Sequence, residues 1–178
     1  GYGSPEPRAV EEVFRAICVT GVPDDGLRFD PSSVTAAPIR DQAEYDGLRV
    51  KLVAHLGSAR IPLQVDIGFG DAITPDPEIA EFPPLLEFPA PRVRMYPRET
   101  VIAEKLHGMV RFGIANTRMK DYYDLWFLSE HFPFEGTTLQ RAIQATFQRR
   151  GTALPDRQPV ALTDEFGRSR EKERQWTA

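Results

Sequence analysis

Two neighbouring stretches of the chain alternate between apolar and polar side chains. In residues 48–56 and again in residues 61–69, apolar side chains occupy every second position. Successive side chains of a strand point to opposite faces of a sheet, and residues 57–60 can turn the chain between the two stretches. The pattern predicts two half-buried strands, with shorter extended pieces at Leu27–Phe29 and Val34–Ile39.

Four other segments place apolar residues at the three- and four-residue intervals of a helix. The expected helices are residues 4–18, residues 98–112, a segment that begins near Arg118, and a segment that ends at Gly151. Ser4 is the expected cap of the first helix, and Thr137 or Thr138 is that of the last.

The segments that remain have the composition of loops or extended chain. Residues 71–97 contain seven prolines, which allow little helix, so we expect an extended crossing segment with a short strand at Arg92–Tyr96. Residues 41–47 are polar and predict a loop. Residues 152–178 are rich in charge, which indicates a solvated helix or a loose tail.

The helix at residues 98–112 carries a charge within its apolar face. At ~100° per residue, Lys105 falls between Val101, Met109 and Phe112 rather than on the polar side. The expected polar side consists of Thr100, Glu104, His107 and Arg111.

The next helix carries two acidic residues on a face that should be buried. Asp121 and Asp124 share this face with Leu125 and Leu128, and aromatic residues cover most of the rest, so we expect a mostly buried helix. An unpaired ammonium or carboxylate moved out of water costs several kcal/mol. We therefore expect Lys105 to meet Asp121 or Asp124. A structural tie between helices and a catalytic pair both fit this pattern.

A third acidic residue lies in the middle of a predicted strand. Asp66 is poor strand material, and the adjacent Gly68 leaves room beside it. Spacing alone favours a solvent-facing residue on an amphipathic sheet. The functional alternative is a carboxylate that projects into a cleft, where it suits a hard divalent cation or proton abstraction from a hydroxyl.

The composition of the chain limits the class of protein and the partners that it can have. The 178 residues suffice for one sizeable core, and a net charge of -4 gives no general attraction to nucleic acid or to an anionic membrane. Cys18 is the single cysteine, which excludes an internal disulfide and fits a reducing compartment. The chain lacks the P-loop, dinucleotide-turn, serine-elbow and zinc-helix motifs. Without a run of ~20 apolar residues, we expect no membrane span and a cytoplasmic protein.

Basic residues gather in sequence around the helix that carries Lys105. If they also gather in space, they form a phosphate-attracting rim; otherwise they are the positive half of a mixed surface. They are Arg92, Arg94, Arg98, Arg111, Arg118 and Lys120.

Several of these segments together resemble the nucleotidyltransferase AbiEii/AbiGii toxin family. The resemblance rests on YPRETVIAEKL at residues 96–106 followed by RMKDYYDL at residues 118–125. The strand QVDI at residues 64–67 and the helix end FQRRG at residues 147–151 resemble the family in the same order. The similarity covers about residues 60–155 well and the rest loosely.

The resemblance implies an α+β fold with a nucleotidyltransferase-like, polymerase-beta-like mixed sheet, packed helices and a C-terminal helical part. On this interpretation residues 1–97 are the remainder of the nucleotidyltransferase-like core, residues 98–155 are the helical part with the Lys105 and Asp121 motifs, and residues 156–178 are a charged tail.

The resemblance also implies transfer of a nucleoside monophosphate from a nucleoside triphosphate to an acceptor hydroxyl, such as that of a tRNA 3' end. It implies Mg²⁺, a role in a toxin–antitoxin or phage-defence pair, and a cognate antitoxin as a possible partner. Carried over by position, Lys105, Asp121 and Asp66 are the catalytic candidates, with Asp66 as a metal ligand, and Asp124 and Arg118 are secondary.

The sequence departs from the family pattern at its start. The family's Gly-Ser/Thr turn and Asp-x-Asp strand should precede the first helix, and neither is found from Gly1 onward. We therefore expect activity of the full-length protein and none of this chain alone. Two alternatives stay open: a non-catalytic interaction module, and a metal-dependent nuclease that uses Asp66 with Lys105.

Overall fold

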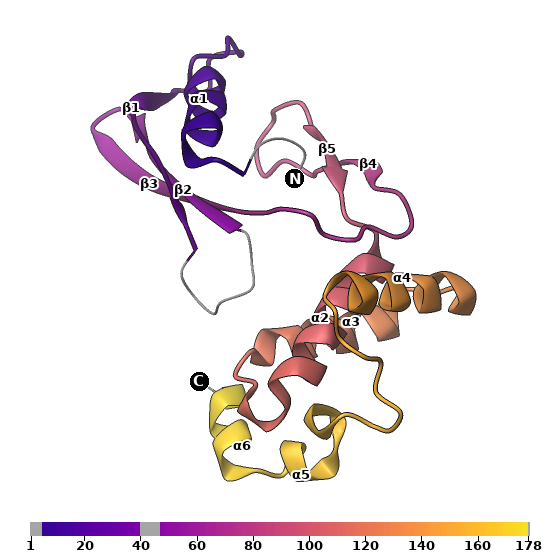
Figure 1. Ribbon diagram of the computed structural model, residues 1–178. Coiled ribbons are helices and arrows are strands. Elements are labelled where there is room, and N and C mark those ends of the chain that lie inside the picture. Colours follow the sequence, from indigo (N-terminus) through magenta and orange to yellow (C-terminus); the bar gives the residue numbers. More distant parts are fainter. Residues whose placement is uncertain (1–4, 40–46, 178) are drawn as a thin grey trace. The chain divides into compact units, whose positions relative to one another are not determined.

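The computed structural model describes residues 5–39 and 47–177, which form two compact units that meet in sequence at Asp71 and Ala72 (Figure 1). The predicted cap Ser4 and residues 41–46 of the predicted loop lie outside the described residues. The expected organisation into residues 1–97, 98–155 and 156–178 stays a prediction.

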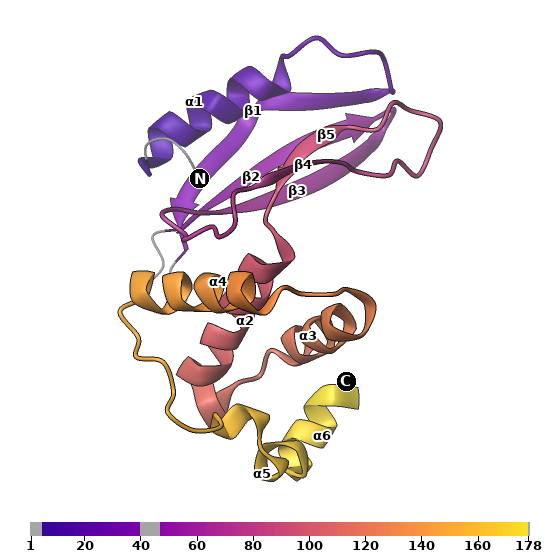
Figure 2. The ribbon, with the colours of Figure 1, turned by 90° about the vertical axis from the view of Figure 1, so that its right-hand side faces the viewer.

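Unit 1 is a three-stranded antiparallel sheet with one helix packed against it. The strands lie in the order β1 (Leu27–Pro38), β2 (Gly47–Leu56) and β3 (Ala59–Gly68), and α1 (Pro7–Cys18) packs on β1 (Figure 2). The two alternating stretches predicted as strands are thus confirmed. The two short pieces predicted before them belong to one strand, whose pairing shifts register between Asp30 and Thr35.

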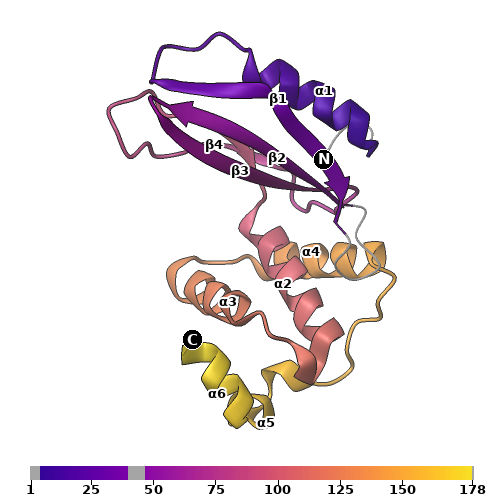
Figure 3. The ribbon, with the colours of Figure 1, turned by 90° about the vertical axis from the view of Figure 1, so that its left-hand side faces the viewer.

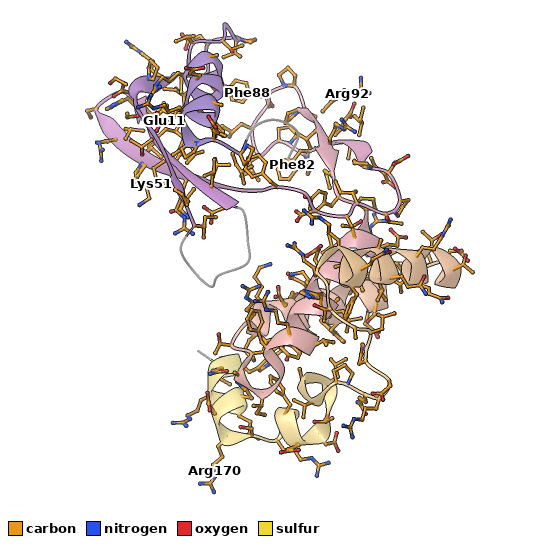
Figure 4. All side chains as sticks on the ribbon, viewed as in Figure 1. Glu11, Lys51, Phe82, Phe88, Arg92 and Arg170 are labelled. Atoms are coloured by element: carbon orange, nitrogen blue, oxygen red, sulfur yellow. The ribbon has the colours of Figure 1, made fainter. Side chains whose placement is uncertain are left out.

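The alternation of β2 and β3 produces one buried and one open face. Val50 lies opposite Val65 in the register, and the same face carries the buried Leu48 and Leu52 that pack with Val10 of α1. Glu11, labelled in Figure 4, accepts the backbone N–H of Ala36 at 2.9 Å and so ties α1 to β1. The opposite face pairs Arg49 with Asp66 and Lys51 with Gln64.

Unit 2 begins with a short hairpin and continues as a helical assembly. In the proline-rich segment β4 (Glu78–Glu81) pairs antiparallel with β5 (Arg92–Met95), so the predicted strand at 92–96 is confirmed and has a partner that we did not predict. The helices are α2 (Arg98–Phe112), α3 (Met119–His131), α4 (Gly136–Arg149), α5 (Asp164–Gly167) and α6 (Arg170–Thr177), with 3-10 turns η1 (Gly113–Ala115) and η2 (Val160–Leu162). Helices with antiparallel sheets give the α+β class that the sequence predicts.

The predicted polar side of α2 is wrong for two of its members. Thr100 and His107 are buried, and His107 meets the edge of the Phe147 ring of α4 at 5.3 Å. Its Nε2 lies 2.9 Å from Thr152 Oγ1, while Thr100 Oγ1 donates to the Thr74 carbonyl at 2.9 Å. The polar atoms find partners inside the unit, so this side of α2 is a packing surface for α4 instead of a solvated one.

The expectation that α3 is mostly buried is also wrong. None of its residues falls in the buried class, and Tyr123 and Trp126 expose 48% and 55% of their surface. Their rings pack against each other at 5.7 Å on the outside of the helix. Tyr123 and Trp126 therefore cover an exposed side of α3, a helix that lies beside α2 (Figure 3).

The start of α4 is capped by a residue other than those predicted. The backbone N–H groups of Thr137 and Thr138 donate to the carboxylate of Glu135 at 3.0 and 2.7 Å. Hydrogen bonds from the hydroxyl and then the backbone groups of these threonines lower the pKa of Glu135 to about 2. At the other end Gly151 has φ +60°, which only glycine adopts without strain, so the predicted stop is confirmed.

The C-terminal segment is folded against the other helices. Ala161 and Phe166 are buried with Met109 of α2 in a second small core, on which Met119 and Tyr122 of α3 pack. The α6 helix is mostly exposed, as one of the two expected alternatives had it. Among the described residues no helix has the length and apolar composition that crossing a membrane requires.

We predict that Phe147→Ala destabilises unit 2 by about 3–5 kcal/mol, because Phe147 is 1% exposed and its loss leaves a cavity between α2 and α4. Urea unfolding followed by tryptophan fluorescence measures this, since both tryptophans lie in unit 2. Leu85→Ala is the control, because a fully exposed side chain should change stability by less than about 0.5 kcal/mol. Equal unfolding curves for the two variants would contradict the burial of Phe147 between α2 and α4.

Candidate active site

The ammonium of Lys105 lies between the two carboxylates of α3, as the sequence predicts. Its Nζ is 2.5 Å from Asp121 Oδ1 and 2.9 Å from Asp124 Oδ2. The exposed fraction is 18% for the Lys105 side chain, 20% for Asp121 and 23% for Asp124. The prediction named one carboxylate or the other, and the structure brings both to the same ammonium.

Burial and charge act in opposite directions on the Lys105 pKa. Partial burial disfavours the ammonium, but hydrogen bonds to Asp121 and Asp124 and their negative charges outweigh it, so the pKa is raised above the ordinary lysine value. The pKa of Asp124 is lowered, first by its hydrogen bond from Lys120 and then by that from Lys105. Lys105 is therefore a fixed cation at neutral pH rather than a proton donor or acceptor.

A second lysine, which we did not assign to the site, completes a four-charge cluster. Lys120 Nζ lies 2.8 Å from Asp124 Oδ2, and its side chain is 84% exposed. Its position four residues before Asp124 on the same helix was the available sequence signal. Two ammonium groups and two carboxylates leave the cluster neutral overall, so each carboxylate has a cationic partner.

The turn between α2 and α3 sets the position of the carboxylates. Gly113 has φ +49°, which lets the chain leave α2, and the side chain of Asn116 accepts the backbone N–H of Arg118 at 2.9 Å. Helix α3 then begins at Met119, which brings Asp121 and Asp124 to face α2 one turn apart. The Arg118 guanidinium lies 5.0 Å from the centre of the Phe112 ring at the edge of this region.

Asp66 has a different environment, on the open face of the sheet in unit 1. Both its carboxylate oxygens accept from the Arg49 guanidinium, from Nε and from Nη2 at 2.8 Å each. This hydrogen bonding and the charge of Arg49 lower the Asp66 pKa. Asp66 belongs to one unit and Lys105 to the other, so the assignment of both as catalytic residues stays a prediction.

The described residues do not by themselves make a magnesium site. Mg²⁺ prefers several oxygen ligands in octahedral geometry. Within residues 5–39 and 47–177, no three His, Cys, Asp or Glu side chains are grouped so that they could hold a metal ion. The Asp66 carboxylate supplies one ligand at most and is engaged by Arg49. The Mg²⁺ implied by the sequence resemblance stays a prediction.

The chain is thus an α+β protein whose helical unit holds a lysine paired with two carboxylates. The family model of the nucleotidyl transferase AbiEii toxins, which act in type IV toxin–antitoxin systems, matches residues 1–178. The chain therefore belongs to this family. The resemblance seen in the sequence is confirmed and extends over the whole chain. Searches of the curated proteins and of the solved structures found no significant match.

We predict that Lys105→Met raises the pKa of Asp124, because one of its two cationic partners is lost. A carboxylate with a lowered folded-state pKa contributes stability that is present above its unfolded pKa and lost as pH falls through the folded pKa. Acid unfolding of the variant should accordingly show a weaker contribution from this group. Carbon-detected NMR titration of the side-chain carboxyl groups measures the change.

Glu135 is the internal control for that titration. Its pKa of about 2 comes from Thr137 and Thr138 at the start of α4, so Lys105→Met should leave it unchanged. An Asp124 titration that is the same in both proteins would show that Lys105 does not neutralise it in solution.

Proposed function

We propose that the full-length protein transfers a nucleoside monophosphate from a nucleoside triphosphate to an acceptor hydroxyl, with RNA such as a tRNA 3' end as the acceptor. Membership of the nucleotidyltransferase toxin family supports the reaction class. The position of Lys105 between Asp121 and Asp124 is the observation that carries the residue assignment.

The chemistry is an in-line displacement at phosphorus. The acceptor oxygen attacks the α-phosphorus, the bond from the α-phosphorus to the oxygen that bridges to the β-phosphorus breaks, and pyrophosphate departs while the hydroxyl proton passes to solvent. Negative charge grows on the departing oxygens, and a cation held in place before the reaction stabilises it without reorganisation. In this proposal Lys105 supplies that cation.

The carboxylates make Lys105 suitable for this role by orienting it. A lysine side chain is flexible, with several rotatable bonds, and Asp121 and Asp124 hold two of its three N–H groups. In the proposal, the third N–H group donates a hydrogen bond to a phosphate oxygen of the substrate. The four-charge cluster is neutral overall, so attraction of the triphosphate depends on further cations. In this proposal Arg118 supplies one of these positive charges.

Asp66 takes the role of a metal-binding carboxylate in the proposal. When bound, Mg²⁺ would neutralise charge on the phosphates. A single carboxylate does not hold a pair of such ions. In this proposal Asp66 therefore acts together with further metal ligands, which the described residues do not group around it. The type IV toxin–antitoxin assignment further supports a cognate antitoxin as partner, and we keep that partner in the proposal.

We predict that Lys105→Ala lowers transfer by the full-length protein by about 100-fold or more. The assay supplies each of the four nucleoside triphosphates, labelled at the α-phosphate, together with an RNA pool. Helix content measured by circular dichroism should change little, because Lys120 still neutralises Asp124 and both carboxylates retain access to water. Arg168→Ala is the matched control, since it removes a cation from an ion pair that is exposed on both sides.

The same assay separates the alternatives. Wild-type turnover by Lys105→Ala would remove this residue from the mechanism. Shortening of RNA without added nucleotide would favour a metal-dependent nuclease, and inactivity of the wild-type full-length protein with every nucleotide would favour a non-catalytic interaction module.

A separate prediction concerns the carboxylate of unit 1. Asp66→Asn should abolish transfer, because it removes the charge while keeping a side chain of the same size that still accepts from Arg49. Glu12→Gln, an equal change of charge at an exposed position of α1, should retain activity. Full activity of Asp66→Asn at saturating Mg²⁺ would exclude the proposed metal-binding role.

A further inference from the structure

A groove in unit 2 lies between α3 and the C-terminal helices, and we name it the α6 groove. Its volume is about 550 Å³, within the range of pockets that bind small molecules. Most of its wall is apolar or aromatic. Its lining residues include Met119, Tyr122, Phe166, Lys172, Glu173 and Trp176.

The lining includes a buried ammonium. The Lys172 side chain is only 5% exposed, and its Nζ donates to the carbonyl oxygen of Asn116 at 2.8 Å and to Oε1 of Gln175 at 3.2 Å. Both acceptors are neutral. The carboxylate of Glu171 lies 4.0 Å away and is 64% exposed, so solvent screens that pairing. A buried cation with mainly neutral partners favours an anion beside it.

The aromatic part of the groove offers a surface for a flat ring. Tyr122 and Phe166 stack with centroids 5.1 Å apart, and the Lys172 ammonium lies 5.1 Å from the Phe166 ring. Trp176 adds a ring that is 55% exposed. Rings stack on one another in offset geometry, so the α6 groove joins an aromatic wall to a fixed positive charge.

Tyr122 adds a buried hydroxyl to the same wall. Among the described residues its Oη makes no hydrogen bond of ordinary geometry, and the same is true of Asn116 Nδ2. Burial raises the pKa of Tyr122 to about 12; the neighbouring Asn116 offsets part of that rise, and the charge of Asp121 adds to it. The hydroxyl therefore keeps its proton at neutral pH.

We propose that the α6 groove binds a small planar aromatic molecule that carries an anionic group. The ring stacks among Tyr122, Phe166 and Trp176, and the anion accepts from Lys172. A purely apolar ligand would leave the ammonium without a counter-charge, and a simple inorganic anion would leave the aromatic wall uncovered. Glu173 at the exposed edge repels further negative charge, which favours ligands of low net charge.

This site is independent of the proposed transferase chemistry. Lys105, Asp121 and Asp124 do not line the α6 groove, which draws on Met119 and Tyr122 of α3 instead. Ligand binding can therefore be measured without turnover, and failure of one proposal leaves the other standing.

The experiment titrates the protein with anilinonaphthalene sulfonate, an aromatic anion whose fluorescence reports binding. Adenosine monophosphate, adenosine and naphthoate then serve as competitors that separate nucleotides from other aromatic anions. We expect the two anions to displace the probe and neutral adenosine to compete about tenfold more weakly or worse, because a charge-assisted hydrogen bond is missing. Displacement by naphthoate but not by the nucleotide would assign a non-nucleotide ligand.

Matched variants locate the bound probe. Lys172→Met keeps the apolar stem and should weaken probe binding about tenfold or more, whereas Arg170→Met, the same change of charge on the same helix, should leave it unchanged. Arg170 is exposed, and its labelled side chain projects away from the helices (Figure 4). Glu173→Gln should strengthen binding, because it removes a repelling carboxylate.

A second variant keeps the proposal testable if Lys172→Met does not fold. Trp176→Ala removes an exposed ring, so the core should stay intact while affinity for the probe falls. Equal affinity of wild type, Lys172→Met and Trp176→Ala would overturn the proposal and indicate adventitious binding elsewhere. Displacement of the probe by neutral adenosine at the same concentration as the anionic competitors would also overturn it. Lys105→Ala should bind the probe as the wild type does.

Discussion

A charge that leaves water needs a partner, and this constraint fixes how α2 is held in unit 2. Two consecutive residues of α2 point to different neighbours. Glu104 accepts from Arg150 at the end of α4 at 3.0 Å, and Lys105 donates to the two carboxylates of α3. All five side chains are at most 23% exposed, so water screens these charges only in part. Helix α2 is therefore fastened on both sides.

The same arrangement restricts what Lys105 can do chemically. Paired with two carboxylates, it keeps its proton, so acid–base catalysis by this residue is disfavoured and electrostatic stabilisation is favoured. The orientation of the ammonium is set before any ligand arrives, because both carboxylates contact it in the absence of a ligand. The second carboxylate adds a geometric constraint on the ammonium.

Sequence patterns predicted those features that depend on near neighbours in the chain. The strand pair β2–β3 follows from strict alternation, and the meeting of Lys105 with α3 follows from a charge on the wrong face of a helix. The prediction of a polar side for α2 was wrong because Thr100 bonds to Thr74 and His107 to Thr152. The spacing of residues along the helix does not reveal such distant partners. The burial of Lys172 likewise depends on the carbonyl of Asn116, 56 residues away in sequence. For this reason the sequence alone led us to predict a charged tail at residues 156–178.

The candidate catalytic residues are divided between the two units: Asp66 lies in unit 1, and Lys105 and Asp121 lie in unit 2. The geometry of Lys105, Asp121 and Asp124 is complete within unit 2, since every contact that defines it lies between α2 and α3. Asp66 makes its own pair with Arg49 within unit 1. The charges of both sets are satisfied within their own unit, so each set also stabilises the fold of that unit. A reaction that uses both residues requires a fixed arrangement of the two units around the substrate. Loss of transfer at both Lys105 and Asp66, with each unit still folded, is therefore what separates a shared active site from two structural pairs.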